Sequence, residues 1–145
     1  MKDDPYGEGL APLRLGTSGL HENEISKQIL DASIEVHRTL GGPGLLESVY
    51  EEALAWELEE RRLGVQRQVY LPISYKGRVL GSPLRIDLVV GGKVIVECKA
   101  VVVYHAIFEV QTLTYLRLCG LKLGLVVNFG EQRVKDGFHR VVNGL

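Results

Sequence analysis

Cysteine is scarce in this sequence, because the 145 residues contain only Cys98 and Cys119. Neither belongs to a Cys-x-x-Cys pair, and no histidine is spaced to complete a zinc site with them. A disulfide framework and a structural zinc are therefore both unexpected. We interpret the two cysteines as small apolar side chains.

Long apolar runs are also missing. No stretch approaches the roughly 20 apolar residues that a membrane-spanning helix needs. Residues 1–23 begin with Lys2, Asp3, Asp4 and Pro5 and hold no apolar segment of the kind found in a signal peptide. These absences predict a cytoplasmic protein with no membrane partner.

Net charge is nearly absent, since the formal total is −1, but the two parts of the chain differ sharply. Residues 1–60 carry 4 basic and 13 acidic side chains, whereas residues 61–145 carry 13 basic and 5 acidic ones. A basic portion of this kind is typical of proteins that bind polyanions such as nucleic acid. The alternative is two solvated faces that attract each other within the fold.

What is present is the composition of an ordinary globular domain, with 46% hydrophobic and 24% charged residues. The length matches one compact domain. Residues 1–22 are rich in glycine, proline and short polar residues without apolar periodicity, which predicts a mobile N-terminal extension. Residues 23–145 are expected to form a single domain.

Two stretches show helical spacing of apolar residues. The first runs from Glu24 to Leu40, with Asn23 as the expected cap and a glycine-rich break after it. The second runs from about Leu46 to Arg62 and ends before Gly64. Its expected packed face comprises Leu46, Val49, Tyr50, Ala53, Leu54 and Leu58.

Strand-like alternation follows, over residues 66–75, 78–80, 84–90 and 93–99, with turns at Lys76-Gly77 and Gly91-Gly92. Residues 105–119 return to helical spacing, and residues 121–129 suit a buried strand that lies parallel to its neighbour after a helical crossover. A short final strand is expected within residues 132–143. The packed face of the third helix is expected to hold Ile107, Val110, Leu113 or Thr114, and Leu118. The predicted fold is α/β, in the order α-α-β-β-β-α-β, with helices flanking a mixed sheet made of an antiparallel meander and one parallel strand.

Alternation within residues 84–99 predicts which side chains share a face. Ile86, Leu88 and Val90 form one apolar row, and Val94, Val96 and Cys98 form the matching row on the next strand. Both rows share a face only if paired residue numbers have an even sum, so the connecting loop must hold an odd number of residues. A three-residue loop over Val90-Gly91-Gly92, with Gly92 in the left-handed conformation, meets this requirement.

That register places Asp87, Glu97 and Lys99 together on the opposite face. Two converging carboxylates repel each other, and an oxygen-preferring cation such as Mg²⁺ or Mn²⁺ would neutralise them. Lys99 would then lie where its charge can orient a water or stabilise a developing phosphorane. The alternative is a surface ion pair between Glu97 and Lys99 on a solvated sheet face.

The arrangement of Asp87 on one strand and Glu97-Cys98-Lys99 on the next, between helices, resembles the core of the restriction-endonuclease-like PD-(D/E)xK nuclease superfamily. Residues 44–50, Gly-Leu-Leu-Glu-Ser-Val-Tyr, are similar to the G-x-x-E-x-x-Y motif of one group within it. The resemblance spans roughly residues 25–143. Two departures stand out: no proline precedes Asp87, and Phe108 stands where many close relatives are expected to have histidine.

The resemblance implies a site built from Glu47, Asp87, Glu97 and Lys99, in which the three carboxylates bind metal. Gln111 and Tyr115 match the Q-x-x-x-Y element of related nucleases, and Tyr50 supports the site. Taken without the resemblance, Glu47 is also an acidic residue that favours a helix N-terminus, Tyr50 a core residue, and Gln111 with Tyr115 a pair one helical turn apart.

The leading hypothesis is therefore a metal-dependent phosphodiesterase that acts on DNA or RNA, without a small-molecule cofactor. The alternative is a catalytically silent module with a nuclease fold that binds nucleic acid or assembles with other proteins. The apolar run Val101-Val102-Val103 suggests either a contact in a homodimer or an extension of the strand into the core.

Overall fold

The computed structural model describes residues 19–145, and the elements below are those of this part of the chain. The helices and strands are, in order, α1 (Glu22–Thr39), α2 (Glu47–Glu60), β1 (Val65–Leu71), β2 (Ser74–Tyr75), β3 (Arg78–Val79), β4 (Leu84–Val90), β5 (Val94–Lys99), α3 (Ile107–Cys119), β6 (Leu123–Asn128), the 3-10 turn η1 (Val134–Gly137) and β7 (Phe138–Val142).

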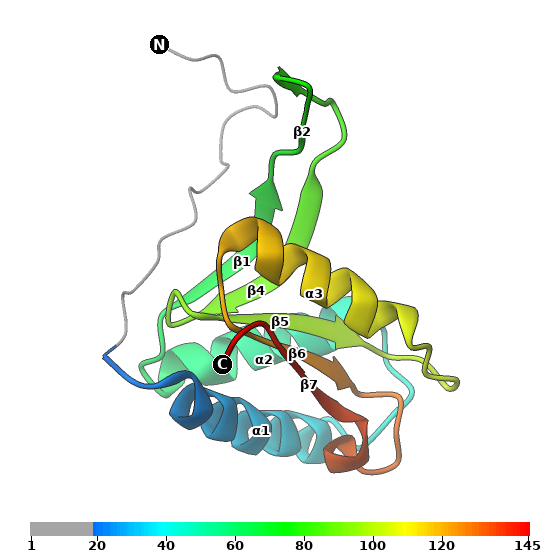
Figure 1. The fold of residues 1–145 in the computed structure, drawn as a ribbon. Coiled ribbons are helices and arrows are strands. Elements are labelled where there is room, and N and C mark those ends of the chain that lie inside the picture. The colour runs from blue at the N-terminus through cyan, green and yellow to red at the C-terminus, as the bar shows by residue number, and fades with distance from the viewer. Residues whose placement is uncertain (1–18) are drawn as a thin grey trace.

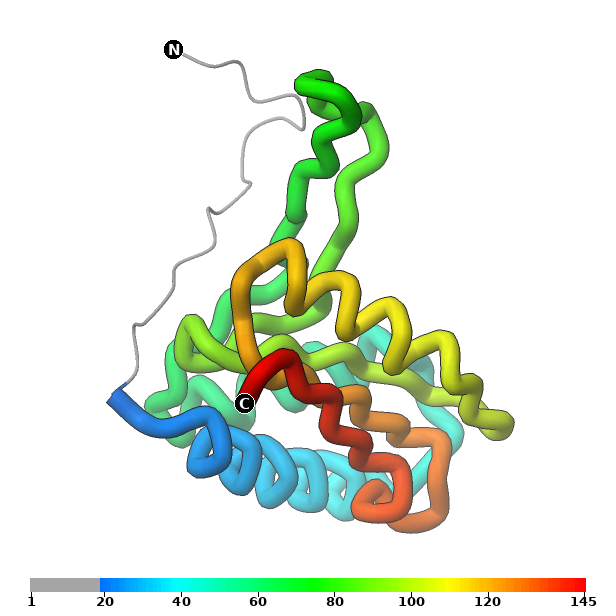
Figure 2. Tube along the Cα trace, in the orientation of Figure 1, coloured from blue at the N-terminus to red at the C-terminus, as the bar shows by residue number. Residues whose placement is uncertain are grey.

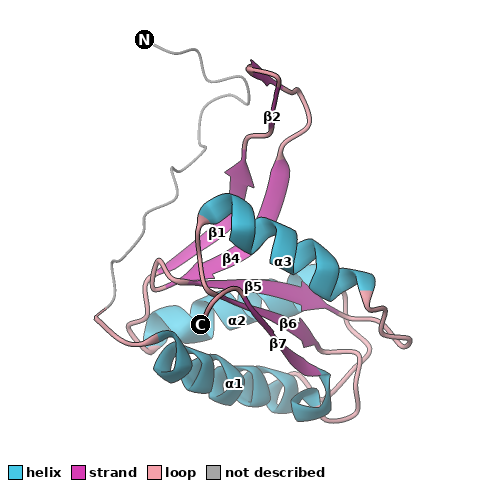
Figure 3. Cartoon of the chain, viewed as in Figure 1, coloured by secondary structure: helices cyan, strands magenta, loops and turns pink. Residues whose placement is uncertain are grey.

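A five-stranded sheet in the order β1-β4-β5-β6-β7 forms the centre of the molecule (Figure 1). Strands β1, β4 and β5 are antiparallel, β5 and β6 are parallel through the crossover helix α3, and β7 closes the other edge antiparallel to β6. Helices α1 and α2 cover one face and α3 covers the other (Figure 3). The predicted α/β class, the element order and the single parallel strand pair are confirmed.

The first helix begins earlier than its apolar period predicts. Helix α1 starts at Glu22, and the cap is His21 instead of Asn23, because the His21 ring accepts a hydrogen bond from the Asn23 N–H. Glu24 bonds back to the His21 N–H and completes a capping box. Most of the predicted extension, residues 1–18, lies outside the described residues.

Helix packing differs from the predicted faces in two places. In α2, Leu46 and Val49 are 73% and 37% exposed, while Glu51 is buried. In α3, the predicted packed residues Ile107, Val110 and Leu118 are exposed, and the buried positions are Thr112 and Leu116. Thr112 can be buried because its hydroxyl donates to the Phe108 carbonyl at 2.8 Å. The side chains of Thr112 and Leu116 both pack over Gly124 of β6.

The strand predicted over residues 66–75 is divided. Strand β1 ends at Leu71, before Pro72, and β2 and β3 form a separate two-stranded hairpin that extends beyond the main sheet (Figure 2). Its turn is Lys76-Gly77, and both residues have positive φ, as a two-residue hairpin turn requires.

A buried amide holds the chain that leaves β5 against the chain that leaves β6. Asn128 accepts from the Val101 and Gly130 N–H groups, each at 3.0 Å, and donates to the Val101 carbonyl at 3.0 Å. Gly130 packs so closely there that an added Cβ would lie 2.2 Å from the Val101 oxygen.

We therefore expect Gly130→Ala to lower the free energy of unfolding by about 2–3 kcal/mol, because the backbone of residue 101 must shift and strain the Asn128 bonds. Chemical denaturation measures the change. Gly81→Ala is the matched control, since nothing lies within 4 Å of an added Cβ there. Equal stability of the two variants would contradict the close packing.

Candidate functional site

The candidate site depends on the register between β4 and β5. The paired residues are Leu88 with Val96, Val89 with Ile95, and Val90 with Val94. Their sums are even, as predicted, and the loop has three residues. The loop is Gly91-Gly92-Lys93 instead of Val90-Gly91-Gly92, so the prediction was wrong by one position. Both glycines have positive φ, at 62° and 68°, which explains why two are needed.

Residues 84–87 of β4 do not pair with β5, because the backbone pairing of the two strands ends at Leu88 and Val96. From there, β4 runs toward the β2–β3 hairpin, while β5 continues across the sheet (Figure 1). Two carboxylates replace the missing backbone bonds. The Asp87 carboxylate accepts from the Cys98 N–H at 2.9 Å, and the Glu97 carboxylate accepts from the Asp87 N–H at 3.3 Å. The two side chains therefore cross in the gap between the strands.

The same point changes which way β4 side chains face. Leu88 and Val90 pack under α1 and α2 as predicted, but Ile86 packs with Val89 and Ile95 on the α3 side. The predicted apolar row of Ile86, Leu88 and Val90 is therefore wrong. The prediction that Asp87 shares a face with Glu97 and Lys99 fails for the same reason, because Asp87 lines a cleft with Glu47 and Glu51 of α2, whereas Lys99 lies against Phe108 of α3. On the neighbouring strand, Gln68 interrupts the pairing opposite Asp87 and has φ of 51°, so the alternation breaks in both strands at the site.

A third carboxylate, which the sequence analysis did not identify, lies beside Asp87. Glu51 of α2 is 6% exposed, accepts from Gln68 Nε2 at 2.7 and 2.8 Å, and pairs with Arg67 at 3.1 Å. A usable signal was present, because Glu51 follows Glu47 by one helical turn. The predicted packed face of this helix did not include Glu51.

Burial and mutual repulsion control the charges of this cluster. Asp87 and Glu97 are 6% and 7% exposed. Burial, with a further contribution from the Asp87 charge, raises the pKa of Glu97 to about 9. Burial also raises the pKa of Glu51, and Asp87 again adds to the effect. A cluster in this state binds protons at neutral pH unless a cation replaces them.

Lys99 completes the acid-acid-lysine set on the α3 side of the gap. Burial and the Asp87 charge raise the pKa of Glu97, and the positive charge of Lys99 lowers it in part. The Lys99 ammonium lies 4.6 Å from the centre of the Phe108 ring. Tyr115 of α3 is close as well: burial raises the pKa of its hydroxyl, and the Glu97 and Asp87 charges raise it further. Phe108, the departure from the expected histidine, therefore supports the lysine directly.

The remaining predicted residues occupy different positions. Glu47 is exposed on the rim of the site, and Gln111 is exposed on α3. Tyr50 is fully buried, stacks on Phe129 with ring centres 4.7 Å apart, and donates from its hydroxyl to the Gly42 carbonyl at 2.7 Å. Its hydroxyl also accepts from the Leu45 N–H. Tyr50 thus holds the loop before α2 and does not face a substrate.

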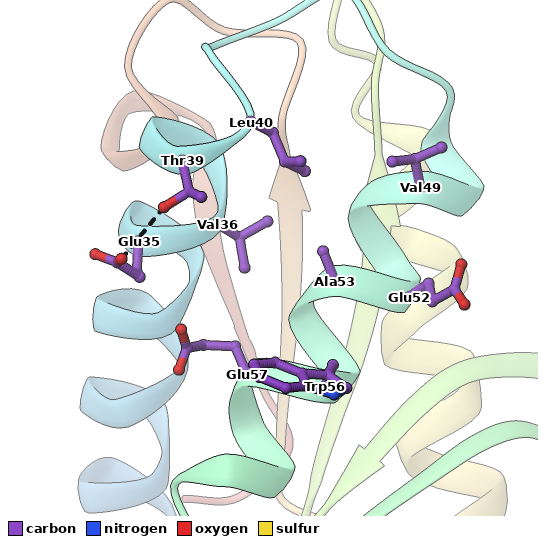
Figure 4. A pocket seen from close by; sticks show the side chains of 9 residues that line it. All are labelled: Glu35, Val36, Thr39, Leu40, Val49, Glu52, Ala53, Trp56 and Glu57. Atoms are coloured by element: carbon purple, nitrogen blue, oxygen red, sulfur yellow. Dashed lines mark hydrogen bonds between the residues drawn. The ribbon is translucent and has the colours of Figure 1, made fainter.

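An open cleft of about 540 Å³ leads to the carboxylates. Glu47, Glu51 and Asp87 line it together with Arg67 and Arg85. A separate cleft of about 560 Å³ lies between α1 and α2, where Val36 and Ala53 face each other above Trp56 (Figure 4). None of the predicted site residues lines this second cleft.

The donor set in the gap is compatible with a divalent cation. Asp87 and Glu97 offer only carboxylate oxygens, which Mg²⁺ and Mn²⁺ prefer. A cation there would offset both the burial and the Asp87 charge, which together raise the pKa of Glu97. Within residues 19–145, no three His, Cys, Asp or Glu side chains are grouped closely enough to hold a metal by themselves. Water or substrate oxygens would have to complete the coordination.

Comparison with known proteins agrees with this geometry. The model of the PD-(D/E)XK nuclease superfamily matches residues 23–141. This chain belongs to that superfamily. No curated protein and no solved structure matches it significantly. For this PD-(D/E)XK chain, no helix among the described residues has both the length and the apolar composition to cross a bilayer.

Proposed function

We propose that this PD-(D/E)XK chain is a metal-dependent nuclease that hydrolyses phosphodiester bonds in DNA or RNA. The observation that carries the proposal is the pair of buried carboxylates, Asp87 and Glu97, which cross in the gap between β4 and β5 with Lys99 beside them. Buried like charges cost stability, so a site with this arrangement is typical of function and not of folding.

Asp87 and Glu97 would hold Mg²⁺ or Mn²⁺, with Glu47 or Glu51 bound to the metal's water. A cation held there would polarise the scissile phosphate and make a bound water more acidic. Lys99 carries the positive charge that stabilises the developing phosphorane, and the Phe108 ring keeps its ammonium beside Glu97.

We also propose that the chain belongs to the G-x-x-E-x-x-Y group, which the motif at residues 44–50 supports, that residues 23–145 form one domain, and that the protein acts in the cytoplasm. The predicted homodimer contact has apolar surface available, since Val102 and Val103 are 93% and 79% exposed.

The deciding experiment incubates the protein with plasmid, single-stranded DNA and RNA in Mg²⁺ or Mn²⁺. We expect cleavage by the unmodified chain and a loss of roughly a hundredfold or more in Lys99→Met, which keeps the side-chain length and removes the charge. Lys122→Met is the matched control, because Lys122 is exposed just before β6, at the end of that strand away from the candidate site.

Equal cutting by the two variants would show that the activity does not come from this site. Metal-independent binding of nucleic acid without any cleavage would instead support the silent module.

A further inference from the structure

The β2–β3 hairpin extends past the sheet without covering any of it (Figures 1 and 2). Residues 74–82 are all exposed, including Tyr75 at 59% and Val79 at 53%. A two-stranded hairpin with no core beneath it is only marginally stable in water. A hairpin with exposed apolar side chains is therefore expected to have a binding partner.

The charge of this segment indicates what that partner is. Residues 65–86 contain four basic side chains, Arg67, Lys76, Arg78 and Arg85, and no acidic one. Within the described residues, Lys76, Arg78 and Arg85 form no salt bridge, so their charge is not neutralised inside the fold. Unpaired positive charge along an exposed ribbon favours a polyanion.

The hairpin is continuous with the candidate site. Strands β1 and β4 lead directly into it, and Arg67 and Arg85 at its base line the same cleft as Asp87 and Glu51. Arg67 is already paired with Glu51, which leaves Arg85 as the cleft's free cation among the described residues. A polyanion that reaches the carboxylates therefore also passes the hairpin.

The shape of the hairpin distinguishes between nucleic-acid forms. Strands β2 and β3 pair over only two residues each, and residues 72–83 give each side of the protrusion about six residues, a reach of roughly 20 Å. Single strands are usually held in a concave groove lined by aromatic rings, whereas the major groove of a duplex admits a two-stranded ribbon. The hairpin is a protrusion and not a groove.

We propose that residues 72–83 form an arm that contacts double-stranded nucleic acid beside the cleavage point. Lys76 and Arg78 at its tip bind phosphates, Arg85 at its base binds the phosphate nearest the site, and Tyr75 adds an apolar contact. This inference rests on the proposed nuclease function and extends it to the class of substrate.

The test reverses the two charges at the tip. In Lys76→Glu/Arg78→Glu, we expect the Kd for a fluorescent duplex, measured by anisotropy in EDTA, to rise at least tenfold. The slope of log K against log salt should decrease in magnitude by nearly two, because two phosphate contacts are lost. With Mg²⁺, KM should rise by a similar factor while kcat stays within twofold.

Lys27→Glu/Lys122→Glu is the matched control, since both lysines are exposed and lie away from the site, and its Kd should stay within twofold of the unmodified chain. All three proteins are compared by thermal unfolding and by sedimentation.

If Lys76→Glu/Arg78→Glu binds the duplex with unchanged affinity and still cleaves it, the proposed contact between residues 72–83 and the duplex is wrong, and the nuclease proposal is unaffected. Loss of affinity for single strands alone would overturn the assignment to duplexes. A change in sedimentation without a change in duplex affinity would show that the hairpin contacts a second copy instead. If the unmodified chain neither binds nor cuts nucleic acid, both proposals fail.

Discussion

Asp87→Asn should abolish divalent-cation binding and reduce cleavage by about a thousandfold, equivalent to roughly 4 kcal/mol of transition-state stabilisation. The asparagine oxygen can still accept the hydrogen bond from the Cys98 N–H, so the crossing between β4 and β5 is retained. What is lost is one of two negative charges that a cation would bridge. Calorimetric titration with Mn²⁺ measures binding, and a plasmid-nicking assay measures the rate.

The control for this result is Asp31→Asn, which removes an exposed carboxylate that pairs with Arg61 far from the site. Its cation affinity and cleavage rate should match the unmodified chain, because a surface ion pair contributes little. Unchanged Mn²⁺ binding in Asp87→Asn would exclude Asp87 as a metal ligand, whatever the effect on cleavage.

Glu97→Gln should make the metal-free protein more stable at alkaline pH, by the order of 2–4 kcal/mol at pH 8. The folded-state pKa of Glu97 is about 9, against an ordinary value of 4.5, so the folded chain holds a proton that the unfolded chain has released. Between these two values the free energy of unfolding falls as pH rises, by up to about 1.4 kcal/mol per pH unit. Glutamine does not ionise and removes this slope.

Denaturant titrations in EDTA at pH 5, 6.5 and 8 measure the effect. The unmodified chain should lose stability across the series, while Glu97→Gln should lose clearly less, because only Glu51, whose pKa burial also raises, still contributes to the fall. The exposed carboxylate of Glu52 provides a control, because Glu52→Gln should retain the slope of the unmodified chain. Added Mg²⁺ should restore stability at pH 8 only where Glu97 is present, since cation binding displaces the proton. Parallel pH profiles for all three chains would exclude Glu97 as the titrating group.

Local features predicted the fold well where they act over short range. The glycine at position 120 ends α3 in the left-handed conformation, and the apolar run in residues 121–129 forms the parallel strand β6. Helix α1 forms over the stretch that its apolar spacing predicted, and its residues Ile25, Ile29 and Val36 are buried. The parity argument for β4 and β5 succeeded because side chains alternate strictly along paired strands.

The same argument failed where pairing itself ends. Ile86 left its predicted row because β4 and β5 separate at Asp87, and nothing in the alternation of residues 84–90 indicates where a ladder stops. The packed face of α3 was also predicted wrongly, because the burial of its residues depends on the strand that lies beneath the helix. Thr112 is buried over Gly124, a contact between residues that the sequence places on separate elements.

By itself, the sequence determined the α/β class, the two-residue spacing of Glu97 and Lys99, and the odd-numbered loop that sets the register between β4 and β5. Only the tertiary structure decided that Glu51 joins the carboxylates, that Tyr50 holds a loop, and that an acid-free hairpin extends from the site. The reason is physical: periodicity reports which side of an element is apolar, whereas a buried charge depends on what the neighbouring elements place around it.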